Sequence, residues 1–420
     1  MLPRTFLPLL LVGFTLHAAD WPQYRGLTTD GKSTEKIVKP WTSAPPKVLW
    51  KTPSLGGFSS MVVAGDRAYC LSLEEIDGAK QEALVAMDAN TGKMLWNAAL
   101  NVAKYDGGGD SGAPGNDKGD GPRSTPTIVG DHVFTLSSQL VLRGFDNKGA
   151  SIWTRDLVKE NNGHNIQWQN AASPLLEGGL LYVGGGGAGE SLLAINPKDG
   201  SVVWKAFDEK ITHATPVAAS ILGQRQVIFF LQSGLLSVEP KTGKELWRYA
   251  FKYNTSTAAS PVVSGDIVYC SAGYGVGAGA VKVSREGDKF VAKEIYRKTG
   301  NKPLANHWST PICKDGFLYG MFQFKEYTTG PVKCVDISNG EVKWEKTGFG
   351  PGQVILAGDQ VLALSDAGDL VLFAADTAAY NELARAHVLD GKCWTTPILA
   401  NGRIYARSTK EAVCVDVSGR

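Results

Sequence analysis

The sequence AMDANTGKMLW at residues 86–96 is the strongest indication of the fold, because its pattern returns along the chain. The same spacing of a small or acidic residue, a Gly and a Trp recurs at residues 194–204, 237–247 and 334–344, and a shortened form ends at Trp153. Self-similarity at a fixed period is typical of proteins built from repeated supersecondary units. The chain is therefore predicted to be a repeat array, a kind of scaffold that carries many unrelated functions.

A second repeated phrase, Ser or Thr followed by Pro, opens each copy ahead of the first phrase. Six copies are intact and two are degenerate, and the eight phrases are centred on Met61, Pro126, Pro174, Pro216, Pro261, Pro311, Val354 and Pro397. Successive phrases lie 42 to 50 residues apart, except for a first interval of 65 that contains an insertion. This period matches a four-stranded propeller blade of ~40–50 residues.

Within one copy, alternating apolar residues and turn residues predict four short strands, at residues 126–129, 133–137, 140–145 and 152–155. No stretch shows a sustained helical period with capping residues, which argues against helical solenoids. The predicted fold class is an all-β, eight-bladed β-propeller.

The two ends of the chain favour a closed ring. The last copy, residues 394–417, has three predicted strands and stops before a Gly–Trp phrase, whereas a lone strand at residues 48–51 precedes the first copy. Pairing the two would complete the eighth blade and remove an unpaired sheet edge. We therefore expect residues 20–420 to form a single propeller domain closed by an N-terminal strand.

The Gly–Trp phrase has a structural explanation. The Gly can adopt positive φ in a tight turn, and the Trp buries a large ring between neighbouring blades. Six tryptophans are predicted to dock in this way: Trp50, Trp96, Trp153, Trp204, Trp247 and Trp344. The fifth and seventh copies lack this Trp and carry Tyr296 and His387 near its place.

Composition indicates an exported globular protein. The formal net charge is only +2, so the electrostatic footprint of a nucleic-acid-binding protein is missing. Residues 1–19 resemble a cleavable signal peptide, and no second apolar stretch approaches the ~20 residues of a membrane span. We expect a periplasmic or secreted propeller that is monomeric and has no transmembrane span.

The six cysteines form no Cys-x-x-Cys motif and no adjacent pair. We expect them to be small buried side chains, although disulfides form in oxidising compartments. Cys70 and Cys414 are the pair to test, because the first and last copies adjoin in a ring.

The Ala-x-Asp-x-x-Thr-Gly-x-x-x-Trp phrase resembles the tryptophan-docking motif of quinoprotein (PQQ) β-propellers. Residues 21–26 (WPQYRG) and 391–397 (GKCWTTP) are similar to the bacterial PQQ-like repeat proteins. This resemblance covers nearly the whole chain after residue 19. It points to two better-understood relatives, the PQQ-dependent alcohol dehydrogenases and the outer-membrane assembly scaffold of the BamB type.

The resemblance implies two alternative functions. A dehydrogenase would need PQQ, calcium and a carboxylate base, and its alcohol-oxidising relatives clamp PQQ against a disulfide of adjacent cysteines, which this sequence lacks. No catalytic residue and no metal ligand can be assigned from spacing. The insertion at residues 104–121 holds four aspartates that could collect Ca²⁺, although a Gly-rich surface loop is the simpler interpretation.

In propellers of this family, the segments that lead into the innermost strands gather around one mouth of the central channel. Residues ahead of the Ser/Thr-Pro phrases should therefore converge there, and the candidate binding residues are Arg123, Gln169, Asn170, His213, His307, Trp308, Lys392 and Trp394. Basic side chains suit an anionic ligand, and Trp rings can stack on a flat one. We expect a non-catalytic binding or assembly scaffold with an unknown protein or small-molecule partner at this mouth; the alternative is a PQQ- and calcium-dependent alcohol or sugar dehydrogenase.

Overall fold

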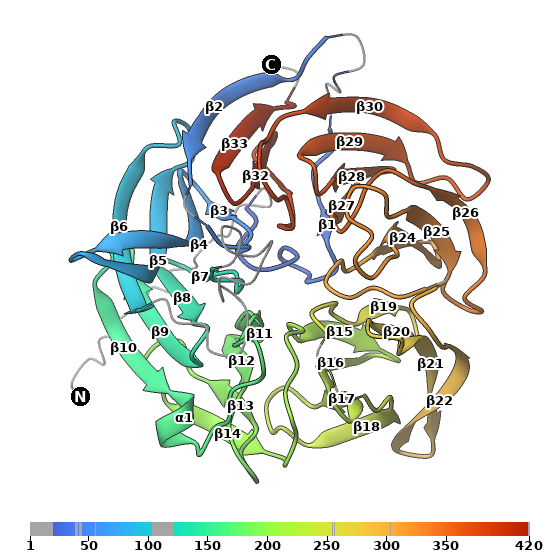
Figure 1. The fold of residues 1–420 in the computed structure, drawn as a ribbon. Coiled ribbons are helices and arrows are strands. Elements are labelled where there is room, and N and C mark those ends of the chain that lie inside the picture. Colours follow the sequence, from blue (N-terminus) through green and yellow to red (C-terminus); the bar gives the residue numbers. More distant parts are fainter. Residues whose placement is uncertain are drawn as a thin grey trace, which may run out of the picture.

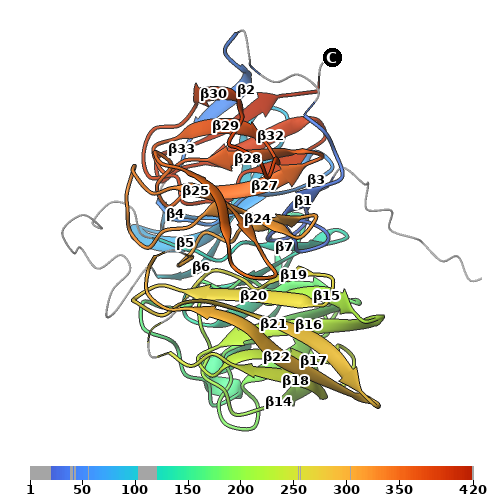
Figure 2. The same cartoon turned by 90° about the vertical axis from the view of Figure 1, so that its right-hand side faces the viewer.

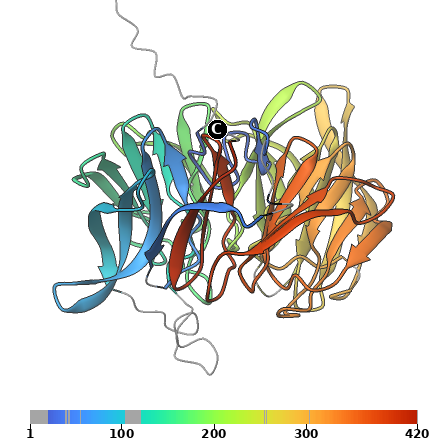
Figure 3. The same ribbon diagram turned by 90° about the horizontal axis from the view of Figure 1, so that it is seen from above.

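Eight β-sheets arranged in a ring make up the fold (Figure 1). The structure is a computed structural model, and it describes residues 20–37, 41, 44–54, 56–102, 121–253, 255, 257–302 and 304–418. The predicted signal peptide and the four aspartates of the insertion lie outside the described residues. Seen edge-on, the ring is a short cylinder of blades (Figure 2, Figure 3). The predicted all-β, eight-bladed propeller is confirmed.

Each blade has four strands that follow one another from the channel outward (Figure 1). Blades one to three consist of β3 (Val62–Ala64), β4 (Arg67–Ile76), β5 (Ala79–Asp88) and β6 (Met94–Val102); β7 (Thr127–Val129), β8 (His132–Leu136), β9 (Val141–Asp146) and β10 (Ser151–Asp156); and β11 (Leu175–Glu177), β12 (Leu180–Gly184), β13 (Leu192–Ile195) and β14 (Val202–Ala206). A one-turn helix, α1 (Leu157–Glu160), follows β10. The strands of blade two lie within one residue of those predicted from the sequence.

Blades four to six consist of β15 (Val217–Ile221), β16 (Gln224–Leu231), β17 (Gly234–Val238) and β18 (Glu245–Ala250); β19 (Val262–Ser264), β20 (Ile267–Ala272), β21 (Gly277–Glu286) and β22 (Lys289–Lys298); and β23 (Ile312–Lys314), β24 (Phe317–Met321), β25 (Val332–Asp336) and β26 (Val342–Lys346). Blade seven consists of β27 (Gln353–Ala357), β28 (Gln360–Leu364), β29 (Asp369–Ala374) and β30 (Glu382–His387). Inner and middle strands are largely buried because neighbouring blades cover both of their faces, whereas outer strands such as β14 alternate between partly buried and exposed residues.

The eighth blade closes the ring with strands from both ends of the chain. Its three inner strands are β31 (Ile398–Ala400), β32 (Arg403–Arg407) and β33 (Glu411–Asp416), and its outer strand is β2 (Lys47–Pro53). β2 pairs antiparallel with β33 (Figure 1), and the register of this pair places Trp50 opposite Cys414. This pairing confirms the predicted closure by the N-terminal strand.

Trp50 shows how the blades dock on one another. Its ring lies against Gly92 of blade one, and its Nε1 donates a hydrogen bond of 3.0 Å to the Ala89 carbonyl. Gly92 has a φ of +70°, and a Cβ added there would lie 2.5 Å from the Trp50 ring. The same contact joins four further Trp–Gly pairs or their equivalents: Trp96 with Gly149, Trp153 with Gly200, Trp204 with Gly243, and Tyr296 with Gly340.

Three blades vary this arrangement. Trp344 donates to the Asp376 carbonyl at 2.8 Å, whereas Trp247 donates to the Gln226 side chain of its own blade at 2.7 Å. In blade seven the residue after the outer-strand bulge, which is the docking position elsewhere, is Ala384. The prediction that His387 lies near this position was wrong, because His387 comes three residues later, is largely exposed and contacts Asp369.

Residues 20–35 enter the channel and return, which the sequence did not predict. Asp20 and Glu35 accept backbone hydrogen bonds from the first hairpins of blades one and eight, so both ends of the segment lie on the face where the inner strands end. Between these two residues, the segment forms hydrogen bonds with the inner strands of blades one, two, three, four and seven. Its short strand β1 (Lys32–Ser33) pairs in parallel with β27. The buried Arg25 donates to the carbonyls of Thr310 and Pro311 at 3.1 and 2.9 Å.

All six cysteines are buried and free, so Cys70 and Cys414 form no disulfide. They occupy core positions, as small apolar side chains do. Among the described residues, no helix has the length and apolar character required to cross a membrane.

Candidate functional site

The Ser/Thr-Pro phrases form a ring of hydrogen bonds around the channel. In most blades the hydroxyl of this phrase accepts the backbone N–H of the equivalent residue in the preceding blade. The bonds run from Ser60 N to Thr125 Oγ1 (3.2 Å), Thr125 N to Ser173 Oγ (2.8 Å), Ser173 N to Thr215 Oγ1 (2.9 Å), Ser260 N to Thr310 Oγ1 (3.0 Å) and Thr396 N to Ser60 Oγ (2.9 Å). The ring fixes the strand entrances at one level, which explains why this phrase is repeated.

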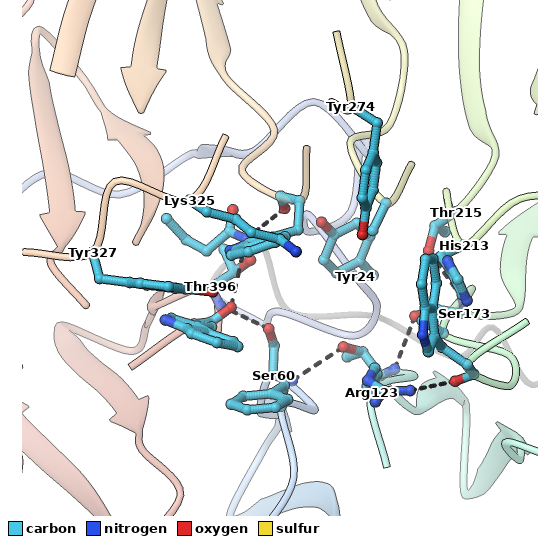
Figure 4. A pocket seen from close by; sticks show the side chains of 18 residues that line it. Tyr24, Ser60, Arg123, Ser173, His213, Thr215, Tyr274, Lys325, Tyr327 and Thr396 are labelled. Atoms are coloured by element: carbon cyan, nitrogen blue, oxygen red, sulfur yellow. Dashed lines mark hydrogen bonds between the residues drawn. The ribbon is translucent and has the colours of Figure 1, made fainter. Parts of the chain in front are cut away.

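The strand entrances surround a cavity of about 290 Å³, which we call the cup (Figure 4). Every blade contributes at least one residue to it: Phe58, Arg123, Ser173, His213, Ala258, Trp308, Gln353 and Trp394. Tyr24 of the N-terminal segment also lines the cup. One cavity therefore draws on the whole ring.

Four of the eight candidate residues line the cup: Arg123, His213, Trp308 and Trp394. His307 does not, but its ring lies 5.0 Å from that of Trp308, centroid to centroid. Lys392 also lies outside the lining, with its Nζ 5.3 Å from the centre of the Trp394 ring. These two residues support the aromatic rings of the cup.

Gln169 and Asn170 do not line the cup either. The buried Asn170 side chain donates to the carbonyls of Ser137 and Ala172 at 3.3 and 3.0 Å, and so holds the turn before β11. Gln169 lies in that turn and accepts a hydrogen bond from Asn165. Both residues shape the entrance of blade three.

The sequence did not point to five aromatic or basic residues of the lining: Tyr24, Trp168, Tyr274, Lys325 and Tyr327. Tyr274 comes from the β20–β21 loop, and Lys325 and Tyr327 come from the β24–β25 loop. In a meander of four antiparallel strands, the loop between the second and third strands lies on the same face as the entrance to the first. Long loops at that position, such as residues 322–331, were the available signal.

Two aromatic groups face each other across the cup (Figure 4). On one side Trp168 stacks on Tyr274, with ring centroids 6.0 Å apart and planes 9° apart. On the other side Trp394 stacks with Phe58 at 4.8 Å and with Tyr327 at 5.8 Å. Trp308 lies beside them, 5.1 Å from Trp394. Rings packed in this way are held rigidly and still present apolar surface to the cavity.

Left-handed backbone conformations gather at the cup. Trp168, Gln169 and Tyr274 have φ values of +67°, +63° and +57°, and Thr328, next to Tyr327, has +59°. Such conformations are costly for residues with a Cβ and often occur at functional sites. The Arg123 guanidinium donates to the Trp168 carbonyl at 2.6 Å, so it stabilises the turn that carries the Trp168 ring.

Asp366 holds the loop that carries Lys325 and Tyr327. Its Oδ2 accepts the N–H of Thr328 at 2.8 Å from the neighbouring blade. Asp366 itself is buried, and burial raises the pKa of its carboxyl. The loop position thus depends on a carboxyl in blade seven that does not line the cup.

The cup is electropositive. Its lining contains Arg123 and Lys325 and, among the described residues, no Asp or Glu. Burial lowers the pKa of His213 to about 3, aided by the Arg123 charge, and burial likewise lowers that of His307 to about 3. Both imidazoles are therefore neutral near pH 7, and the lasting positive charge comes from Arg123 and Lys325.

Calcium does not fit this lining, whereas a flat anion does. Ca²⁺ takes six to eight oxygen ligands, commonly carboxylates, and the described lining offers no carboxylate. Elsewhere in the described residues, no cluster of three His, Cys, Asp or Glu side chains could hold a metal ion. Stacked rings with two basic side chains could hold the planar, anionic ring system of a quinone cofactor without a calcium ion.

Comparison with solved structures identifies similar propellers. The chain is similar to quinohemoprotein alcohol dehydrogenase from Comamonas testosteroni (13% identity, 96% of this chain and 81% of that chain, TM-score 0.66). It is also similar to BamB from Moraxella catarrhalis (14% identity, 88% of this chain and 99% of that chain, TM-score 0.57) and to quinohemoprotein alcohol dehydrogenase ADHIIG from Pseudomonas putida HK5 (12% identity, 96% and 81%, TM-score 0.65). At these identities the likeness shows the fold alone.

Of the curated proteins compared with the chain, none matches it. A sequence model of the PQQ_2 family, described as outer membrane protein assembly factor BamB, matches residues 80–346. This match spans blades one to six and more than half of the chain. The chain therefore belongs to the PQQ_2 family of PQQ-like β-propellers.

Proposed function

We propose that this propeller is a non-catalytic binding module that takes an anionic ligand, or an acidic segment of a partner, into the cup. The observation that carries the proposal is the composition of the lining, to which every blade contributes at least one residue. Among the described residues, the lining contains aromatic rings, hydroxyls and two basic side chains but no carboxylate. A cation would be repelled there, whereas an anion would gain charge-assisted hydrogen bonds. The proposal includes a monomeric propeller and its export to the periplasm or the exterior; the family and residues 1–19 support the export.

The second candidate is a PQQ-dependent alcohol or sugar dehydrogenase. The stacked rings and basic side chains of the cup favour it, since they suit a planar anion. Proton abstraction from an alcohol needs a base of suitable pKa within reach of the substrate. The described lining holds no carboxylate for this role, and its buried His213 has a pKa of about 3.

One experiment separates the two candidates. The purified protein is incubated with PQQ and Ca²⁺, dialysed, and assayed for retained quinone and for dye-linked oxidation of alcohols and sugars. In parallel, a short poly-glutamate peptide and small carboxylic acids are titrated by calorimetry at low salt. Anion binding without oxidation supports the binding module. Stoichiometric PQQ with dye reduction would replace it by the dehydrogenase.

A further inference from the structure

We propose that the ligand of the cup is a sugar acid, whose carboxylate lies at Lys325 and whose ring packs between Tyr274 and Tyr327. This inference rests on the proposed binding function and narrows it to a ligand class. It follows from three features of the cup: its charge, its hydroxyls and its exposed rings.

Lys325 is the cation that is available to a ligand. Its Nζ lies 5.1 Å from the ring centres of both Tyr274 and Phe324, and among the described residues it makes no ion pair. Arg123 instead holds the turn at Trp168, because its Nη1 donates a hydrogen bond of 2.6 Å to the Trp168 carbonyl. We therefore assign the anionic group of the ligand to Lys325, and treat Arg123 as a positioning residue for Trp168.

The hydroxyls of the lining favour a ligand with many polar groups. Ser60, Thr125, Ser173 and Thr215 all line the cup, and each side-chain oxygen accepts a backbone N–H from the preceding blade. None of their hydroxyl protons is donated to an acceptor among the described residues. A ligand hydroxyl or carboxylate oxygen can accept these protons, whereas a plain aromatic acid would leave most of them unmatched.

The exposed rings favour a ligand with an apolar face. Tyr327 and Tyr274 are 48% and 37% exposed, which is unusual for large rings. They flank Lys325 on the two sides of the cup (Figure 4). A pyranose presents carbon-bound hydrogens on its faces and hydroxyls around its edge. It can therefore cover a Tyr ring while its edge reaches the hydroxyls of the lining.

The test is calorimetric titration of the full-length protein at low salt with D-glucuronate and D-galacturonate. The comparison ligands are glucose, which lacks the charge, 2-naphthoate, which has a flat ring and a carboxylate but no hydroxyls, and a tetraglutamate peptide. We expect the uronates to bind about tenfold more tightly than glucose, as a charge-assisted hydrogen bond supplies. They should also bind more tightly than 2-naphthoate and the peptide.

Variants test the role of Lys325. Lys325→Met should abolish the preference for uronate over glucose, and Lys325→Arg should restore it. Lys289→Met, which removes an exposed charge at the start of β22, is the matched control and should leave uronate binding unchanged. Thermal melting of each variant shows whether it is folded, and the arginine variant excludes a loss of binding through damage to the loop.

The possible outcomes separate a failure of the sugar-acid assignment from a failure of the proposed binding function. Equal binding of uronate and glucose would overturn the assignment to Lys325. Tighter binding of 2-naphthoate or tetraglutamate would overturn the sugar acid but leave the binding module intact. Failure of every anion to bind would overturn both proposals.

Discussion

Ser60 Oγ accepts the backbone N–H of Thr396 at 2.9 Å, which joins residues 336 positions apart in the sequence. This bond is the inner counterpart of the β2–β33 pairing, because it links the entrance of blade eight to that of blade one next to the channel. The ring is therefore closed at its outer edge by a strand and at the cup by a hydroxyl.

Ser60→Ala should destabilise the protein by about 1–3 kcal/mol, because it leaves the buried Thr396 N–H without its acceptor. Urea unfolding measures the change. Ser284→Ala in β21 removes an exposed hydroxyl and should change stability by less than about 0.5 kcal/mol. Equal midpoints for the two variants would show that the hydroxyl ring contributes nothing to closure.

Gly92→Ala should cost more than Gly65→Ala, although both glycines have positive φ. At Gly92 the new Cβ would lie 2.5 Å from the Trp50 ring, whereas at Gly65 nothing lies within 4 Å. The backbone penalty of about 1 kcal/mol is common to both, and overpacking adds about 1–3 kcal/mol at Gly92 only. In a Trp50→Ala background the two costs should become similar; a persistent difference would contradict the docking contact.

Arg25→Met should destabilise the protein by about 2–4 kcal/mol, because the Thr310 and Pro311 carbonyls lose a charged, buried donor. The loss should appear as a lower denaturation midpoint with an unchanged urea dependence. Arg285→Met removes an exposed guanidinium in β21 that lies over the Phe290 ring; it serves as the control and should cost less than about 1 kcal/mol. If both variants lose the same stability, the N-terminal segment is not a structural part of the ring.

The two buried histidines should make the protein sensitive to acid. Burial lowers the folded pKa of His213 and His307 to about 3, whereas an unfolded histidine has a pKa of about 6.5. The unfolded state binds more protons in this window, so stability should fall as pH drops from about 6.5 towards 3, by up to about 1.4 kcal/mol per pH unit for each histidine.

His307→Phe should reduce this slope, and stability measured by urea unfolding at several pH values tests it. His164→Gln, at an exposed position, should leave the slope unchanged. A slope that is the same in His307→Phe as in the wild type would contradict the neutral, buried state of His307.

The repeated phrases predicted the ring well because each phrase has a local cause. The Gly–Trp turn and the Ser/Thr-Pro entrance can each be recognised from a few consecutive residues. The number of these phrases along the chain gives the number of blades. The path of residues 20–35 could not be predicted in this way. That segment is held mainly by backbone groups of blades that are distant in sequence, such as the carbonyls that bind Arg25.

The site was predictable only where it follows the repeat. Trp308 and Trp394 stand just before inner strands, so their place in the cup follows from the blade pattern. Tyr274, Lys325 and Tyr327 lie in loops that differ from blade to blade, and no phrase marks them. The prediction for His387 was wrong for a similar reason, because blade seven lacks the Gly–Trp phrase that marks the docking position. The strand pairing places Ala384, not His387, at that position.

Quenching of tryptophan fluorescence tests whether the cup attracts anions to its aromatic lining, without any assumption about the ligand. Iodide and caesium quench exposed tryptophans, and a positive site favours the anion. Because iodide is intrinsically the stronger quencher, the quenching constant of each ion is divided by its value for N-acetyltryptophanamide. The normalised constant for iodide should exceed that for caesium at low salt, and the difference should shrink in Lys325→Met and persist in Lys289→Met. Equal normalised constants for the two ions in the wild type, unchanged by Lys325→Met, would contradict an anion-binding cup.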